Sequence, residues 1–153
     1  MDNRDIHTLH RIRVILIAVL LSLLAANSGI KIVFVAGDSM LPNYENGNLV
    51  IATKWQEAST GDVVVIRSPS NKNAIKRIIG MAGDTIEIID GQLYRNSEIV
   101  IEGYIVKDRT TFSPVFIPEG MVFVLGDNRP NSIDSREYGC LPIDEIIGTV
   151  MGR

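Results

Sequence analysis

A serine and a lysine are the residues of this sequence whose settings favour chemistry. Ser39 lies in the segment GDSMLP, which follows an apolar, β-branched run over residues 32–36 and precedes a turn. A serine at the end of a strand can be reached from solvent, although a turn serine that bonds its own backbone is the commoner case. Lys76 lies in the apolar stretch 74–79, where desolvation penalises its ammonium form and lowers its pKa. Such a lysine can serve as the general base for a serine nucleophile.

A third segment is densely polar and follows another apolar run. Residues 122–125 are hydrophobic, and residues 126–139 then read GDNRPNSIDSREYG. Together with the Ser39 and Lys76 segments, this loop resembles the boxes of type I signal peptidases: a serine-methionine box, a lysine-arginine box and a closing Gly-Asp-Asn-Arg…Asp-Ser-Arg box. Residues 61–65 resemble a fourth box between the first two. The resemblance covers residues 35–148, and its specificity comes from the order of the boxes rather than from any one of them.

The resemblance implies a fold and an activity. The fold would be mainly β, with coiled antiparallel sheets of the type shared by signal peptidases and self-cleaving repressors, preceded by one N-terminal transmembrane helix. The chain would be a serine endopeptidase that removes signal peptides from exported preproteins after small-x-small sites. Ser39 would be the nucleophile and Lys76 its base, with an acyl-enzyme intermediate. No cofactor and no metal are implied.

Supporting residues follow from the same resemblance. Ser132 matches the serine that hydrogen-bonds and orients the catalytic lysine, and Asp134 and Arg136 match a supporting pair. The backbone N–H of Ser39 is the natural donor to the oxyanion. Some relatives add a serine hydroxyl where this chain has Gly37, so the second donor here is either backbone or a group that the sequence does not identify.

An extended substrate would add as a strand beside residues 32–36 and 73–75. The family requires small residues one and three positions before the cut. Apolar walls too close for large side chains would come from Val35, Ala36, Met40 and Ile75. For Met40, plain core packing is the alternative, and it is compatible with a place in the wall.

The N-terminus predicts a membrane anchor. Residues 14–26 are apolar except for Ser22, and Arg11 and Arg13 come directly before them. By the positive-inside rule, residues 1–13 are cytoplasmic, residues 14–30 form the anchor, and residues 31–153 form the exported catalytic β domain at the cell membrane. The run is only about 20 Å long as a helix, against a bilayer core of about 30 Å. A buried core helix and a cleaved signal peptide ending near Ala26 are the alternatives.

Composition limits the remaining possibilities. The chain has 153 residues, enough for one domain and an anchor, and its net charge of −3 gives nucleic-acid binding no support. The expected partners are signal-peptide-bearing preproteins and the lipid bilayer. The single cysteine, Cys140, cannot form a disulfide within the chain.

The remaining chain reads as short strands separated by turns. We expect strands over residues 48–53, 62–67, 74–79 and 121–125, a hairpin over 84–94 with a type I′ turn, and a further strand pair within 99–105. Residues 107–113 read as a polar loop and 142–147 as a helical turn.

Two other functions remain open from the sequence. A self-cleaving Ser–Lys autoprotease would need a DNA-binding N-terminus, which the apolar run over 14–26 argues against. A catalytically silent, membrane-tethered peptide-binding domain would not need Ser39, Lys76, Ser132, Asp134 and Arg136 together.

Overall fold

The structure is a computed structural model that describes residues 12–18 and 29–152. The chain divides into two units, Met1–Ile30 and Lys31–Arg153. Residues 12–18 of the first unit are helical. Most of the expected anchor and nearly all of the expected cytoplasmic segment lie outside the described residues. Within the described ranges, no helix is both long enough and apolar enough to cross a bilayer. The transmembrane anchor therefore stays a prediction.

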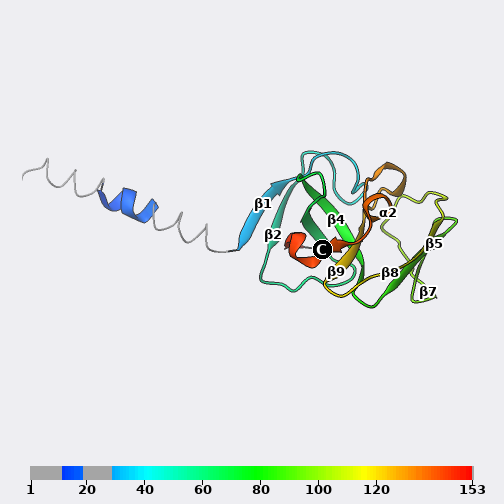
Figure 1. Cartoon of the computed structure of the whole chain (residues 1–153). Helices are drawn as coiled ribbons and strands as arrows, with labels where there is room; N and C mark the ends of the chain where they lie inside the picture. Colours follow the sequence, from blue (N-terminus) through cyan, green and yellow to red (C-terminus); the bar gives the residue numbers. More distant parts are fainter. Residues whose placement is uncertain (1–11, 19–28, 153) are drawn as a thin grey trace, which may run out of the picture. The chain divides into compact units, whose positions relative to one another are not determined.

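The second unit is built from two β-sheets (Figure 1). The larger sheet has seven strands in the spatial order β1 (Ile30–Phe34), β2 (Leu49–Thr53), β11 (Ile146–Val150), β3 (Val63–Arg67), β4 (Asn73–Met81), β9 (Met121–Leu125) and β10 (Leu141–Pro142). The smaller sheet has four, in the order β7 (Glu98–Ile99), β6 (Gln92–Arg95), β5 (Thr85–Ile89) and β8 (Phe112–Phe116). Three short helical turns are η1 (Arg129–Asn131), α2 (Ser135–Tyr138) and η2 (Ile143–Glu145). The expectation of a mainly β fold is confirmed.

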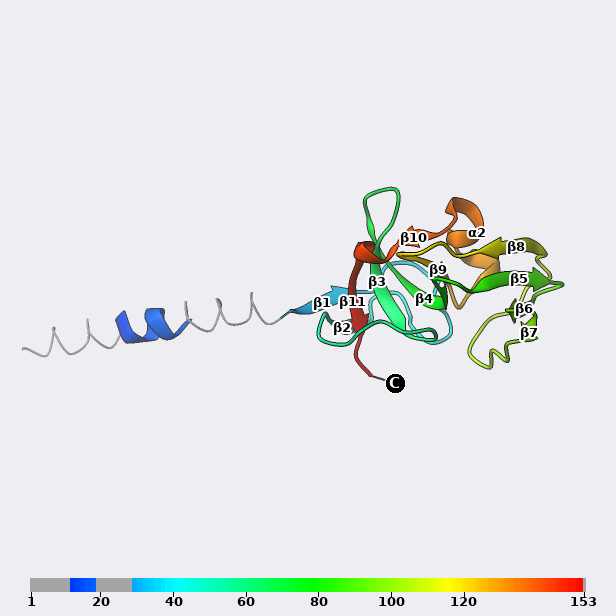
Figure 2. The ribbon, with the colours of Figure 1, turned by 60° about the horizontal axis from the view of Figure 1, so that its bottom comes forward.

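The centre of the larger sheet is buried on both faces, which is why its strands read as continuous apolar runs. Four of the five residues of β3 are buried. Strand β4 lies between β3 and β9, and it pairs antiparallel with both (Figure 2). Lys76 is therefore on an interior strand, opposite Val64 of β3. Lys76 is thus not a solvated lysine on an edge strand.

Two of the expected strand patterns have different outcomes. The hairpin of β5 and β6 is confirmed, because Asp90 and Gly91 have φ values of 48° and 77°, and a type I′ turn needs both to be positive. The strand pair expected within 99–105 is wrong, since β7 ends at Ile99 and residues 100–105 form no ladder. The Glu102 side chain of this segment instead pairs with Arg129 in the polar loop after β9.

The C-terminal part of the chain also departs from expectation. The helical turn expected at 142–147 is only the short η2, and the next residues form β11. This strand enters the larger sheet between β2 and β3. Its Gly148 lies against the backbone of Thr53 in β2, where a side chain would be crowded at 3.1 Å. A glycine at this position permits the close approach of the two strand backbones.

Candidate active site

Ser39 and Lys76 meet directly in the structure. The Lys76 Nζ donates a hydrogen bond of 2.8 Å to the Ser39 Oγ, across 37 residues of sequence. Ser39 lies in the turn that follows β1 and is half-buried, whereas Lys76 is on β4 with 4% of its surface exposed. A base within hydrogen-bond reach of a hydroxyl is the geometry that nucleophilic catalysis requires.

Burial lowers the pKa of Lys76, because it removes water from around the ammonium group. The carboxylates of Asp134 and Asp127 act in the opposite direction, and the guanidinium of Arg136 adds to the lowering. The net effect is a pKa below the usual lysine range. The amine therefore becomes neutral, and able to take a proton, at a lower pH than a solvated lysine would.

We expect the rate of peptide cleavage to rise with pH through the lowered pKa of Lys76, because only the neutral amine can accept the serine proton. The rate should then stay high into mildly alkaline solution. The measurement is kcat/KM against pH on a substrate without ionisable groups near the cut. A profile that is highest in acid would contradict a lysine base and indicate a carboxylate.

The turn that carries Ser39 is fixed from two sides. The backbone N–H of Asn128 donates to the Ser39 carbonyl at 3.0 Å, and the Asn128 side chain donates to the Asp38 carbonyl at 2.9 Å. Met40, only 1% exposed, packs in the hydrophobic cluster that also contains Val35 and Ile75. The nucleophile is thus held between the loop after β9 and the core.

Asp134 and Arg136 organise the loop that closes the site. Asp134 is fully buried and caps α2, and its Oδ2 accepts a hydrogen bond of 3.0 Å from the Gly126 N–H. The guanidinium of Arg136 donates to both carboxylate oxygens of Asp134 at 2.9 Å, and also to the Arg129 carbonyl at 2.7 Å. The pair therefore ties the end of β9 to the start of α2.

Ser132 borders the same cleft as Lys76, but its Oγ is buried without a hydrogen-bond partner among the described residues. The expected hydrogen bond from Ser132 to Lys76 is not formed in this structure. The orienting role of Ser132 stays a prediction.

Gly126 has no side chain, and the Ser132 side chain and the Ser39 carbonyl oxygen occupy the space that a Cβ would take. A Cβ at this position would overlap the Ser132 Oγ and would lie 2.5 Å from the Ser39 carbonyl oxygen. We expect Gly126→Ala to lower kcat/KM by about 100-fold or more, because displacing reacting groups by about 1 Å has effects of that order.

The matched control is Gly103→Ala, since nothing lies within 4 Å of a Cβ built on Gly103 and its φ is not positive. Activity and melting temperature of both variants would be compared with the parent. Equal activity of the Gly126 variant and the control would show that this close approach does not matter to the reaction.

The catalytic pair opens into a cleft of about 320 Å³, lined by residues 36–39, 73–76 and 131–133. Of the four residues expected in the substrate walls, Ala36 and Ile75 line this cleft. Val35 and Met40 lie in the core cluster beneath it, so core packing is what the structure gives for Met40.

The two candidate oxyanion donors differ in their surroundings. The Gly37 N–H already donates to the Asn46 Oδ1 at 3.0 Å. The Ser39 N–H has no acceptor within the part of the chain that the structure describes. A backbone donor beside the nucleophile and without an internal partner is available to an oxyanion.

Sequence reasoning missed a second charged pair beside the catalytic one. Arg77, next to Lys76, binds Asp127 through two hydrogen bonds of 2.8 and 2.7 Å. The Asn43 side chain donates to the same carboxylate at 2.8 Å, and the Tyr104 ring lies 4.1 Å from the guanidinium of Arg77. The signal was present, because a second cation in the apolar stretch 74–79 is as unusual as the first.

A segment over residues 102–108, here called the strap, packs against the loop after β9 and against Arg77 of β4. Alternate residues of the strap reach four different positions: Glu102 pairs with Arg129, Tyr104 stacks on Arg77, Val106 bridges to Asn128, and Asp108 pairs with Arg136 at 3.3 Å. Glu102 and Arg129 are both buried, and the Tyr104 hydroxyl donates to Glu102 at 2.8 Å. The backbone of Val106 makes the one ladder-type contact among these four, while the other three contacts are made by side chains.

The geometry can now be compared with known proteins. Residues 8–153 match the family model described as signal peptidase, peptidase S26. The chain belongs to the signal peptidase family. It is 36% identical to signal peptidase I T of Bacillus subtilis, over 90% of this chain and 80% of that one. It is 33% identical to a probable signal peptidase I-1 of Synechocystis, over 93% and 80%.

A solved structure carries the same fold. A crystal structure of a signal peptidase I from Enterococcus faecalis aligns with a TM-score of 0.55 and 31% identity, covering 63% of this chain and 98% of that one. Signal peptidases of this family are serine peptidases, and the chain is therefore a hydrolase. This decides against the silent peptide-binding domain.

Proposed function

We propose that the chain removes signal peptides from exported preproteins by a Ser–Lys dyad. The observation that carries the proposal is the 2.8 Å hydrogen bond between Lys76 Nζ and Ser39 Oγ in an open cleft. The neutral Lys76 amine takes the Ser39 proton as Oγ attacks the peptide carbonyl, and the resulting ammonium protonates the leaving amine. Lys76 then activates the water that hydrolyses the acyl-enzyme, while the Ser39 N–H stabilises the oxyanion.

The supporting roles follow the contacts around the dyad. Asp134 and Arg136 keep the loop over 126–136 in place, and that loop in turn holds the Ser39 carbonyl through Asn128. The unpartnered hydroxyl of Ser132 borders the cleft, and a rotation of this group would let it accept a hydrogen bond from Lys76 and orient the amine toward Ser39.

The substrate lies extended in the cleft, between the turn after β1 and the start of β4. Ala36 and Ile75 are the walls that meet its side chains. Val35 and Met40 fill the space beneath and limit the depth. Small residues one and three positions before the cut fit such shallow walls.

The test is a preprotein that carries Ala-x-Ala at the end of its signal peptide. The full-length protein in detergent should cut directly after the second alanine, and intact mass would place the cut. A cut within the enzyme's own chain, at a rate independent of protein concentration, would instead support the self-cleaving alternative.

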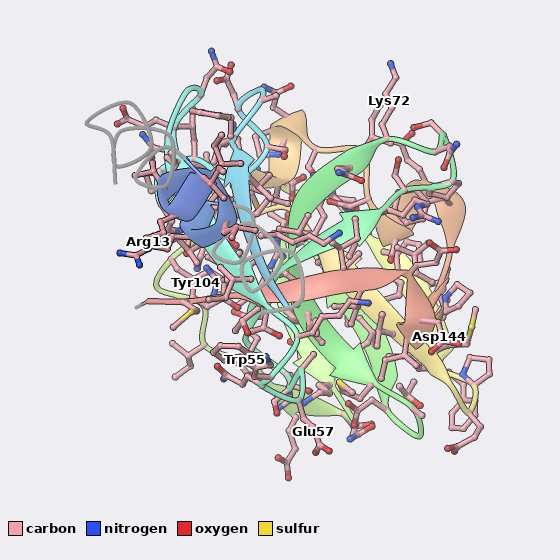
Figure 3. The ribbon with its side chains drawn as sticks, turned by 90° about the vertical axis from the view of Figure 1, so that its left-hand side faces the viewer. Arg13, Trp55, Glu57, Lys72, Tyr104 and Asp144 are labelled. Atoms are coloured by element: carbon pink, nitrogen blue, oxygen red, sulfur yellow. The ribbon has the colours of Figure 1, made fainter. Side chains whose placement is uncertain are left out.

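We further propose that the body rests on the membrane through an exposed apolar face. This face consists of Ile32 and Phe34 of β1, Leu49 and Ile51 of β2, and Trp55 in the loop after β2. Trp55 is 70% exposed, and Figure 3 shows it far from Lys72, which projects from the β3–β4 hairpin. Aromatic side chains favour the membrane interface, which agrees with an anchor over 14–30 and a body on the extracytoplasmic side.

Trp55 reports on this face directly, because it is the single tryptophan of the chain. In vesicles, brominated lipids should quench its fluorescence strongly and aqueous acrylamide weakly. The control is Trp55→Phe combined with Phe116→Trp, which moves the probe to a 63% exposed position on the smaller sheet. Strong quenching of Trp55 by acrylamide, equal to that of the control, would place this face in water.

A further inference from the structure

Asp38 precedes the nucleophile directly and borders the catalytic cleft. The residues that line this cleft include only two ionisable side chains, Asp38 and Lys76. During catalysis Lys76 begins as a neutral amine, because only that form accepts the serine proton. In the active form of the enzyme, the Asp38 carboxylate is therefore the one full charge on the lining of the cleft.

The structure fixes the backbone of Asp38 and leaves its carboxylate available. The Asp38 carbonyl accepts hydrogen bonds from the Asn128 side chain at 2.9 Å and from the Leu41 N–H at 3.2 Å. The residue is exposed, and its carboxylate has no hydrogen bond or ion pair within the described residues. By contrast, the nearby carboxylates of Asp127 and Asp134 are bound by Arg77 and Arg136.

An unpaired carboxylate beside the nucleophile has an electrostatic consequence. It disfavours the negative charge that develops on the substrate carbonyl, and it attracts a cationic side chain of a bound substrate and repels an anionic one. Consecutive residues of an extended substrate are about 3.3 Å apart. The backbone positions within two residues of the cut therefore lie within about 7 Å of the scissile bond, which is less than the screening length of about 8 Å at physiological ionic strength.

We propose that Asp38 is a specificity-determining residue that selects substrates with a cationic side chain near the scissile bond and disfavours anionic ones. The inference rests on the proposed function, since it names a preference of the same cleft. The positions concerned are the second residue before the cut and the first two after it. The residues one and three before the cut are excluded, because they must be small.

The test uses peptides that end their signal sequence in Ala-x-Ala and carry Lys, Gln or Glu at one of these three positions. The full-length protein in neutral detergent is compared with Asp38→Asn and Asp38→Lys. At low salt the parent should cleave the best Lys peptide with a kcat/KM about three- to ten-fold above its Glu counterpart, in the range of exposed charge pairs. The Asn variant should show a ratio near one, and the Lys variant should favour Glu.

The matched control is Asp144→Asn. Asp144, labelled in Figure 3, is also an exposed aspartate, but it lies on η2 and lines a different hollow, together with Thr53 and Lys54. Its removal changes the net charge by the same amount and should leave the Lys-to-Glu ratio unchanged. Raising the salt concentration should reduce the ratio of the parent toward that of Asp38→Asn.

Four outcomes would overturn the inference. In the first, Asp38→Asn keeps the Lys-to-Glu ratio of the parent. In the second, Asp38→Asn raises kcat/KM for all peptides by the same factor, which would assign the effect of Asp38 to the oxyanion alone. Cleavage of every peptide by the parent at one rate would contradict the inference and leave the proposed function standing. Cleavage of none would contradict the proposed function, and the inference with it.

Discussion

Replacing Ser39 with alanine is expected to lower kcat/KM for a preprotein by at least about 10³-fold, because the substitution removes the nucleophile and leaves only binding and oxyanion stabilisation. The fold should persist. The Ser39 side chain makes one hydrogen bond, to Lys76, while the turn is held by the Ser39 carbonyl and by buried Met40. The measurement is the rate of preprotein cleavage, with the melting temperature taken on the same sample.

Ser70→Ala is the matched control for this variant. Ser70 lies in the exposed turn between β3 and β4, outside the cleft. Its loss should leave the rate within about two-fold of the parent. Turnover of the Ser39 variant close to that of the Ser70 variant would remove Ser39 from the mechanism.

Replacing Lys76 with arginine is expected to be as damaging as replacing it with methionine, at about 10³-fold or more in kcat/KM. A guanidinium keeps the charge but cannot be deprotonated in a protein, so it cannot take the serine proton. Methionine keeps the approximate volume and lacks any base. An active arginine variant would make Lys76 an electrostatic support rather than the base.

Replacing Lys76 with methionine also has a predicted effect on the stability of the fold. Burial lowers the pKa of Lys76 in the folded protein, so the unfolded chain binds more protons between the folded and unfolded pKa values. Stability should therefore rise with pH through that window, and the protonated amine should be a cost to the fold below it. Lys76→Met should remove this contribution and melt at least as high as the parent below the folded pKa. Thermal unfolding of both proteins across the alkaline range measures the difference.

Apolar patterning located most of the strands that carry the dyad. Residues 62–67 and 74–79 were predicted as strands, and they form the interior pair β3 and β4. An interior strand is buried on both faces, which makes its sequence a continuous apolar run that a local pattern detects. The same pattern made Lys76 stand out, since a cation in such an apolar run is chemically unusual.

Local sequence patterns gave wrong predictions for segments whose structure depends on contacts with residues far along the chain. Residues 99–105 begin with an apolar, β-branched run that is typical of a strand, but Glu102 pairs with Arg129 and Tyr104 stacks on Arg77. The last strand, β11, depends on a gap between β2 and β3 that chain neighbours do not reveal. In both cases the choice between a ladder and another structure lies with residues far along the chain.

What the sequence by itself determined is the chemistry: a serine at the end of a strand, a lysine in an apolar run and the boxes of the signal peptidase family. What only the tertiary structure decided is their contact. Lys76 meets Ser39 across 37 residues because β4 is fixed between β3 and β9, and because Asn128 holds the turn over 38–39. Arg77 meets Asp127 across 50 residues for the same reason. Residue type sets what a side chain can do, whereas its partner and its pKa depend on which segments the packed sheet brings together and closes off from water.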